Sequence, residues 1–312
     1  MSESARKLLV PEVATILEIR DETANGDTKT FKVQVDNPEG AFKHLPGQCA
    51  MLSLFGVGEV MISITSSPTR GWPLELCIKR AGRVTGALHD AQIGDKVGLR
   101  GPYGNVFPVE DWKGKNLVFI AGGFALAPVR CLIDYCLAHR DWFKHIDIIY
   151  GARSPGDLCF KSDIFDRWTK ERDTTVSLTV DRADEAGTWK GAVGFVPAFV
   201  EQLKPSPKDT IAITCGPPIM IKFVLQVLPK LGFTDEQTFT TLELKMQCGV
   251  GKCGRCNIGD KYVCVDGPVF NLSQIKELPS EFQSGGASAG RACGPAGQRL
   301  GEGGSVNPAG DN

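Results

Sequence analysis

The sequence has no long hydrophobic run and no excess of either charge. None of its apolar runs approaches the ~20 residues that a membrane-spanning helix needs, and the longest, such as Leu117–Ala121, have the length of buried strands. The polar stretch Met1–Arg6 lacks the apolar core of a signal peptide. With 35 Lys and Arg against 36 Asp and Glu, the chain also lacks the basic surplus that nucleic-acid binding requires. We therefore expect a cytoplasmic protein with no transmembrane segment and no nucleic-acid partner.

The C-terminal stretch is poor in large apolar side chains, and 9 of the 29 residues from Ser284 to Asn312 are glycine. A stretch of this composition buries too little surface to offset its ordering entropy. We therefore expect residues 284–312 to form a disordered tail.

A disulfide framework is not expected either. The chain has 11 cysteines, an odd number, and no export signal precedes them. Four of them, Cys248, Cys253, Cys256 and Cys264, fall within 17 residues. In a reducing compartment, thiols clustered in this way indicate a metal ion or an iron–sulfur cluster.

The first third of the chain consists of short alternating segments, such as Phe31–Val35 and Leu74–Ile78, separated by turn dipeptides. One helical stretch, Val84–Ala91, interrupts them. This pattern predicts an antiparallel β-barrel or β-sandwich, which we assign to residues 1–108.

From residue 109 the pattern changes to strands that alternate with helices, which predicts a parallel sheet covered on both faces. We assign residues 109–236 to this Rossmann-like α/β domain and residues 237–283 to a small cysteine-rich segment. The expected strands are Leu117–Ala121, Ile146–Tyr150, Val176–Val180 and Ile211–Thr214, and the expected helices are Ala127–His139, Lys161–Lys170, Val196–Leu203 and Ile219–Leu231.

The strongest motif is the run from Cys248 to Cys256, with the spacing C-x4-C-x2-C, followed by Cys264. A [2Fe–2S] cluster needs four converging thiolates, and this run resembles the loop of plant-type ferredoxins. The alternative is a zinc site. Zinc sites typically pair two C-x2-C knuckles, and this segment has only one.

A second motif, Gly122-Gly123-Phe124-Ala125 with Pro128 behind it, follows the first parallel strand. Glycines at a strand-to-helix turn allow a pyrophosphate to approach the helix N-terminus, although a tight turn alone would also explain them. Three further groups follow later strands of the same sheet: Arg153, Cys215, and Gly216 with Pro217. Ligands bind at the carboxyl ends of such strands. Cys215, at a strand end, is the candidate catalytic residue of this edge, although a small residue packing the sheet is the alternative.

The third group of candidates lies in the barrel. A strand carrying Ser63 ends in hydroxyl-bearing residues, and a second strand leads into a helix that begins with a glycine, a cation and a hydroxyl. Both suit a phosphate-bearing cofactor, although hydroxyls at helix starts are also ordinary caps. The cofactor-binding candidates here are Met61, Ile62, Ser63, Ile64, Ile78, Lys79, Gly82, Arg83, Val84 and Thr85.

Over Pro11–Phe270 the sequence resembles the ferredoxin–NADP reductase superfamily, which implies that residues 1–108 form a Greek-key-like, FAD-binding β-barrel. More narrowly, it is similar to a group of electron-transfer proteins that contain FAD and a [2Fe–2S] cluster. This group includes the electron-transfer subunit of dihydroorotate dehydrogenase, the B subunit of anaerobic sulfite reductase and the gamma subunit of cytoplasmic NiFe hydrogenases (sulfhydrogenases), and similar proteins accompany heterodisulfide reductases. The stretches that carry the resemblance are Gly82–Thr85, Gly101–Gly104, Tyr150–Arg153, Cys215–Pro218 and Met246–Cys256.

The resemblance implies that NAD(P)H passes a hydride to FAD, which releases electrons singly to the [2Fe–2S] cluster and on to a partner catalytic subunit, or the reverse. Two departures from the family pattern stand out. Val60 and Met61 replace the usual Arg and Pro of the flavin strand, and Ala125 replaces the third glycine of the nucleotide loop. The alternatives are a stand-alone NAD(P)H:acceptor flavin reductase and a zinc-stabilised interaction module without flavin.

Overall fold

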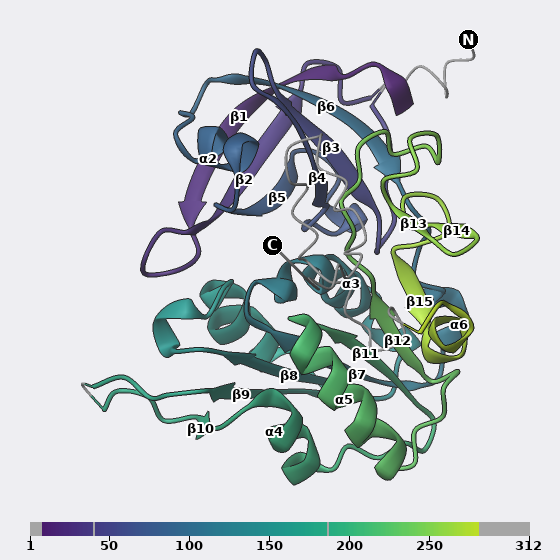
Figure 1. Ribbon diagram of the computed structural model, residues 1–312. Coiled ribbons are helices and arrows are strands. Elements are labelled where there is room, and N and C mark those ends of the chain that lie inside the picture. The colour runs from purple at the N-terminus through teal and green to yellow at the C-terminus, as the bar shows by residue number, and fades with distance from the viewer. Residues whose placement is uncertain (1–7, 40, 186, 281–312) are drawn as a thin grey trace, which may run out of the picture.

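The computed structural model describes residues 8–39, 41–185 and 187–280, so the tail expected over residues 284–312 lies outside the described residues. Two sheets lie one above the other, and the cysteine-rich segment runs along one side in contact with both (Figure 1). In the described part of the chain, no helix is long and apolar enough to cross a bilayer.

The first sheet is antiparallel throughout, with the order β4-β3-β6-β1-β2-β5. A bridge between Ile64, just after β4, and Leu76 of β5 joins the two outer strands and closes the barrel. Alternate residues of these strands point inward to an apolar core, as the alternating sequence predicts. The strands are β1 (Glu12–Asp21), β2 (Thr28–Val35), β3 (Cys49–Leu54), β4 (Gly58–Ser63), β5 (Leu74–Lys79) and β6 (Lys96–Tyr103), and α2 (Arg83–His89) follows β5.

The second sheet has the order β10-β9-β8-β7-β11-β12-β15 and is parallel except for its last strand. Its strands are β7 (Asn116–Gly122), β8 (Ile146–Ala152), β9 (Thr174–Val180), β10 (Ala192–Val193), β11 (Thr210–Cys215), β12 (Thr238–Thr241) and β15 (Val269–Asn271). Its helices are α3 (Leu126–Ala138), α4 (Val196–Leu203) and α5 (Pro218–Lys230).

The apolar run of β7 is buried on both faces of this sheet. Leu117 and Phe119 pack in the core that includes α3, whereas Val118 and Ile120 pack in the core that includes α4 and α5. The predicted α/β sandwich with both faces covered is therefore confirmed.

The predicted helix Lys161–Lys170 is helical along its whole length, but it is not a regular α-helix. The chain forms a π-helical turn over Asp163–Arg167 and a 3-10 turn over Trp168–Lys170. Two buried contacts hold this segment against α3: Asp163 Oδ2 accepts from Arg130 Nε at 2.6 Å, and Trp168 Nε1 donates to Asp134 at 2.9 Å.

The cysteine-rich segment is built into the second sheet. β12 pairs with β11 in parallel, and β15 returns antiparallel to β12, so both strands extend that sheet. Between them lies the small hairpin of β13 (Asn257–Ile258) and β14 (Lys261–Tyr262), and α6 (Leu272–Glu277) closes the segment.

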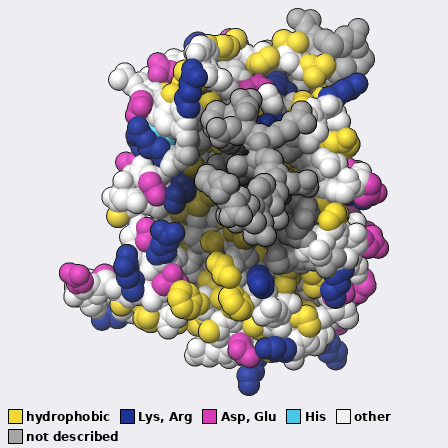
Figure 2. All heavy atoms as spheres, viewed as in Figure 1, with side chains coloured by type: hydrophobic (Ala, Val, Ile, Leu, Met, Phe, Trp, Pro, Cys, Tyr) yellow, Lys and Arg dark blue, Asp and Glu magenta, His cyan; other side chains and the backbone are white. Residues whose placement is uncertain are grey.

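The surface agrees with the balanced composition. Figure 2 shows basic and acidic side chains interspersed over the viewed face, with apolar side chains gathered below its centre, in the region of α4 and α5. Ile219 and Phe223 of α5 are among the exposed apolar residues of the protein, 62% and 47% exposed.

Candidate functional site

A cavity of about 160 Å³ lies where the barrel, the α/β domain and the cysteine-rich segment meet. A cavity of this size encloses part of a ligand rather than the whole of one. Its walls are mainly apolar, with hydroxyls at Ser63 and Thr241, which suits a flat aromatic ring with polar edges. The lining residues are Gly47, Cys49, Met61, Ile62, Ser63, Cys77, Phe124, Ala127, Pro128, Thr241, Leu242, Glu243, Leu244, Met246 and Pro268.

Three of the residues that we expected on the flavin strand line this cavity: Met61, Ile62 and Ser63. Two others do not. Ile64 and Ile78 are 1% and 0% exposed and belong to the barrel core. They support the cofactor strand from inside the barrel and cannot contact a ligand in the cavity.

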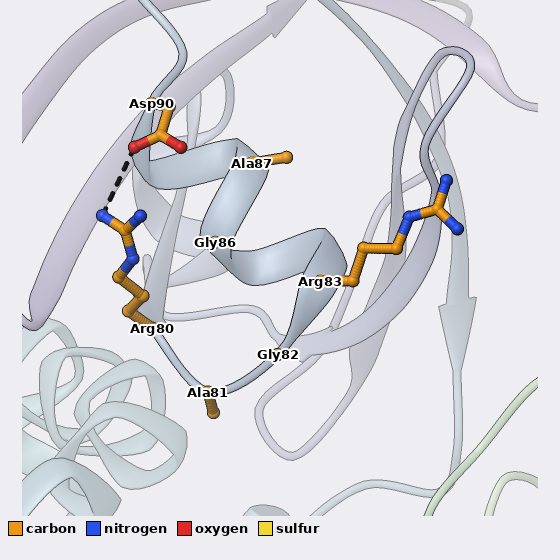
Figure 3. A pocket seen from close by; sticks show the side chains of 7 residues that line it. All are labelled: Arg80, Ala81, Gly82, Arg83, Gly86, Ala87 and Asp90. Carbon is orange, nitrogen blue, oxygen red and sulfur yellow. Dashed lines mark ion pairs between the residues drawn. The ribbon is translucent and has the colours of Figure 1, made fainter.

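The turn before α2 forms a separate, shallow hollow of about 600 Å³ (Figure 3). Arg80 pairs there with Asp90 at 3.3 Å, and Arg83 points away from that pair on the other side of the turn. Lys79 pairs instead with Asp27 at 3.1 Å. Arg83 is therefore the cation of this turn that is not held by either ion pair. Gly82 and Arg83 line the hollow, and Val84 is half-buried behind them.

Thr85 holds this turn together. Its Oγ1 accepts hydrogen bonds from Ala81 N and Gly82 N, both at 2.9 Å, and donates to Gly82 O at 3.2 Å. These three bonds use the whole capacity of the hydroxyl. The structure thus places Thr85 as the residue that shapes the turn rather than as a direct ligand.

Gly122, the last residue of β7, and Gly123, which follows it, have different surroundings. A Cβ at Gly122 would lie 2.3 Å from Met220 Sδ, and a Cβ at Gly216 would lie 2.3 Å from Met220 Cε, so this side chain packs against both. A Cβ at Gly123 would meet nothing within 4 Å, and this residue has φ +58°. The open space at the start of α3 therefore lies over Gly123. Ala125 is 9% exposed and packs into the core, so its methyl group points inward.

Cys215 is placed behind the cavity and not on its wall. Its side chain is 2% exposed, and its Sγ lies 3.1 Å from Thr241 Oγ1. Burial raises the pKa of its thiol to about 12. Thr241 lines the cavity and Cys215 does not, so Cys215 supports a wall residue.

Arg153 follows β8 and is exposed. Its carbonyl accepts from Arg182 N at 3.1 Å, which brings the two arginines to neighbouring strand ends. Burial raises the pKa of Asp181 beside them, although Arg153 and Arg182 act in the opposite direction. Pro217 is exposed at the end of β11 on the same sheet.

The cysteine loop points backbone N–H groups at sulfur. Cys248 Sγ accepts from Val250 N, Lys252 N and Cys253 N at 3.3–3.4 Å. Burial opposes ionisation of this thiol, but the three donors outweigh it and lower its pKa to about 6. Gly251 N donates to Cys264 Sγ at 3.3 Å. At Cys248 these donors stabilise the thiolate, which is the form that binds iron or zinc.

The four cysteine side chains act on one another. Cys253 lowers the pKa of Cys248, whereas Cys256 and Cys248 both raise the pKa of Cys264. Burial and the contact with Cys256 raise the pKa of Cys264 to about 12. Within the described ranges, no group of three or more His, Cys, Asp or Glu side chains is arranged to hold one metal ion.

Several wall residues of the cavity were missed from the sequence. Thr241 and Glu243 come from the end of β12 and the residues just after it, which carry no recognisable motif, and Met246 begins the stretch that carries the resemblance but was not expected on the wall. Desolvation raises the pKa of Glu243. Only the pairing of β12 with β11 brings this stretch to the cavity, and a four-residue strand gives a weak sequence signal.

Three family models match the chain in succession. They are the oxidoreductase FAD-binding domain over residues 17–107, the oxidoreductase NAD-binding domain over 119–226, and the iron-sulfur cluster binding domain of dihydroorotate dehydrogenase B over 243–276. The cavity lies where the matched regions meet.

Two curated relatives from Pyrococcus furiosus align over most of the chain. Sulfhydrogenase 1 subunit gamma is 40% identical over 257 residues, which span 80% of this chain and 88% of the relative. A probable dihydroorotate dehydrogenase B (NAD(+)) electron transfer subunit is 34% identical over 237 residues, which span 76% of this chain and 83% of the relative.

Solved structures show the same fold at lower identity. The NADH-dependent reduced ferredoxin-NADP oxidoreductase aligns with a TM-score of 0.68 and 22% identity, over 85% of this chain and 89% of that one. The ferredoxin NADP+ reductase of Neisseria gonorrhoeae aligns with a TM-score of 0.62 and 20% identity, over 73% and 96%. The expected ferredoxin–NADP reductase fold is thereby confirmed.

Proposed function

The chain belongs to the family of sulfhydrogenase gamma subunits and dihydroorotate dehydrogenase B electron transfer subunits, and we propose that it passes electrons between NAD(P)H and a partner catalytic subunit. The observation that carries the proposal is a cavity lined by all three parts of the chain. A site of this kind lets one bound ring face a nucleotide on one side and the cysteine loop on another.

When bound, FAD accepts a hydride from NAD(P)H and exchanges single electrons with an iron–sulfur cluster, so the protein supplies orientation and electrostatics. Met61, Ile62 and Ser63 with Pro128 would hold the flavin ring between the domains. The turn Gly82–Thr85, with the cation of Arg83, would hold the flavin phosphates.

The nucleotide would lie along the carboxyl ends of the parallel strands. Gly123 leaves open space at the start of α3 for a pyrophosphate, with Gly122, Ala125 and Gly216 shaping the floor beneath it. Arg153 and Pro217 flank this edge. In this arrangement Cys215 acts through Thr241, which faces the cavity.

We propose a [2Fe–2S] cluster on Cys248, Cys253, Cys256 and Cys264 instead of a zinc ion. The support is the spacing C-x4-C-x2-C, which contains a single C-x2-C knuckle, together with the backbone N–H groups that point at the sulfur atoms of Cys248 and Cys264. A dinuclear cluster takes two thiolates on each iron, whereas one zinc ion needs all four around a single centre.

The partner would dock at the rim of the cysteine loop, which we define as Lys252, Cys253, Arg255 and Val265. All four are exposed, and Val265 is 50% exposed. The partner would be the catalytic part of a hydrogenase-, heterodisulfide reductase- or sulfite reductase-type complex. The cysteines of the described residues are free thiols, and we propose that the protein is located in the cytoplasm.

Anaerobically purified protein tests the proposal directly. We expect one FAD, about two irons and about two acid-labile sulfides per chain, the stoichiometry of this cluster type. The Cys256→Ser variant should lose iron and keep flavin, and stopped-flow absorbance should show normal flavin reduction by NAD(P)H without transfer to the partner. A colourless wild-type protein with zinc would establish the interaction module instead, and partner reduction at the normal rate by Cys256→Ser would place the cluster off the path.

A further inference from the structure

Arg100 of β6 reaches out of the barrel and holds the start of the cysteine loop. Its side chain is 7% exposed. The guanidinium donates to Cys248 O at 3.0 Å and to Gln247 O at 3.3 Å. The same group donates to Tyr103 OH at 2.6 Å and forms a two-point ion pair with Glu59 at 2.6 and 3.2 Å. A buried cation thus lies directly against the backbone of the first cluster ligand.

Asn105, in the turn after β6, holds the other end of the same segment. Its Nδ2 donates to Asp266 O and Val269 O, both at 2.8 Å, and its Oδ1 accepts from Val269 N at 2.9 Å. Arg100 and Asn105 therefore bind the segment on both sides of its four cysteines, and both belong to one stretch of the barrel.

Tyr103 brings the loop into direct contact with the barrel. A Cβ at Gly249 would lie 2.7 Å from the Tyr103 ring, and Gly249 has φ +79°. The positive φ and the close approach to the ring both require glycine at position 249, because a side chain there would push the loop away from Tyr103.

Residue pairs across neighbouring strands of the barrel connect Arg100 to the cavity wall. Met61, which lines the cavity, pairs with Met51 of β3, and Met51 pairs with Arg100. Neighbouring strands lie ~4.8 Å apart, so about 10 Å of rigid sheet separates the wall residue from Arg100. The sheet fixes that separation.

We propose that Arg100 is a positioning residue that fixes the cysteine loop against the flavin barrel, and that its charge raises the reduction potential of the cluster. This inference rests on the proposed function. Reduction adds negative charge to the cluster, and a buried cation hydrogen-bonded to the backbone of a ligand stabilises that charge. Glu59, on the guanidinium's other side, weakens the effect by partial neutralisation.

The two residues of the ion pair should therefore act in opposite directions. Arg100→Gln removes the cation and should lower the equilibrium constant for electron transfer to the cluster about tenfold, which corresponds to about 59 mV for a one-electron couple. Glu59→Gln keeps the cation and removes its counter-charge, so the potential should rise. Arg100→Lys keeps the charge and should restore the potential toward that of the wild type.

The experiment is a redox titration of anaerobically purified full-length protein, followed by the electron paramagnetic resonance of the reduced cluster, with iron content measured in parallel. Arg172→Gln is the matched control, since it removes an exposed arginine that pairs with Asp141 in the α/β domain, and its potential should equal that of the wild type.

Opposite shifts in Arg100→Gln and Glu59→Gln support the inference. If both variants shift the potential in the same direction, or neither does while iron content is normal, the inference is overturned and the proposed function stands. If Arg100→Gln takes up no cluster, a raised potential in Glu59→Gln together with a near wild-type potential in Arg100→Lys supports the inference, and an unchanged or lowered potential in Glu59→Gln overturns it. A wild-type protein without iron overturns the proposed function and this inference together.

Discussion

Arg130 of α3 and Glu75 of β5 form a buried ion pair across the boundary between the two sheets, with Nη1 and Oε2 2.5 Å apart. The same guanidinium binds Asp163 at 2.6 Å and lies over the Phe160 ring, 4.8 Å from its centre. Arg130 is 2% exposed. The flavin barrel and the nucleotide domain are therefore joined by a charged contact that water does not reach, and its cost is offset only while all partners are present.

Loss of this contact should destabilise the protein. In Glu75→Gln the guanidinium keeps Asp163 but loses one charged hydrogen-bond partner, so the free energy of unfolding should fall by about 1.5–3 kcal/mol. Urea denaturation measures it. Glu110→Gln, at an exposed carboxylate paired with Lys113, should change the free energy by less than about 0.5 kcal/mol. Equal losses in the two variants would contradict a special role for the contact between the domains.

Gly123→Val should prevent flavin reduction by NAD(P)H while leaving flavin bound, because the new side chain fills the open space at the start of α3. Stopped-flow absorbance of the flavin band measures the rate. Gly114→Val is the control: Gly114 also has positive φ and open surroundings but lies in the turn before β7. The Gly114→Val variant carries a similar backbone strain of about 1–2 kcal/mol, and its flavin should be reduced by NAD(P)H at the normal rate. Slow reduction of both variants would assign the effect to strain alone.

Thr85→Ala should weaken FAD binding indirectly. Without the hydroxyl, Ala81 N and Gly82 N lose their acceptor and the turn before α2 loosens, at a cost of about 0.5–2 kcal/mol, as for the loss of a helix cap. Flavin titration of the apoprotein, followed by fluorescence, gives the dissociation constant. Thr85→Ser keeps the hydroxyl and should bind FAD nearly as well as the wild type. Unchanged affinity in Thr85→Ala would remove this turn from the flavin site.

His44 should make stability fall below neutral pH. Its Nε2 donates to Ser66 O at 2.9 Å, and burial lowers its pKa below the ordinary value of 6.5, although that hydrogen bond acts the other way. As pH decreases toward and below 6.5, the unfolded chain takes up a proton on this residue before the folded chain does. Stability present above pH 6.5 is thus lost as pH falls, by about 1.4 kcal/mol for each unit of pKa lowering.

Thermal denaturation between pH 7.5 and 5 tests this dependence. His44→Gln should be less stable than the wild type at pH 7.5 but should lose less stability on acidification. His145→Gln, at an exposed position, should keep the wild-type dependence. An unaltered pH dependence in His44→Gln would show that other groups cause it.

The fold could be predicted from the sequence where periodicity is strong. The strands Phe31–Val35 and Leu117–Ala121 lie within β2 and β7, and the helix Val196–Leu203 matches α4. β6 was harder to predict because Gly101 and Pro102 interrupt its pattern, and its last residues belong to the sheet only through pairing with β3.

The site was predictable only where a motif carries it. The cysteine spacing identified one loop, and the Met61–Ser63 strand lies on the cavity as expected. The position of Cys215 at a strand end suggested that it lines the cavity. It is instead buried behind Thr241, and this depends on the pairing of β12 with β11. The contact between Arg100 and Cys248 joins residues 148 positions apart, which no local pattern reveals.

β15 closes the edge of the second sheet by pairing with β12. An uncovered edge strand can pair with other chains. Removal of the cysteine-rich segment would therefore expose an edge strand of the second sheet. In an enzyme whose redox domain is joined to the rest by a flexible linker, that domain can move between the electron donor and the electron acceptor. Here there is no tether within the described segment, because strands anchor it at both ends. Under the proposed function, we therefore expect the partner to approach the loop, and we expect docking of the partner rather than movement of this segment to limit electron transfer.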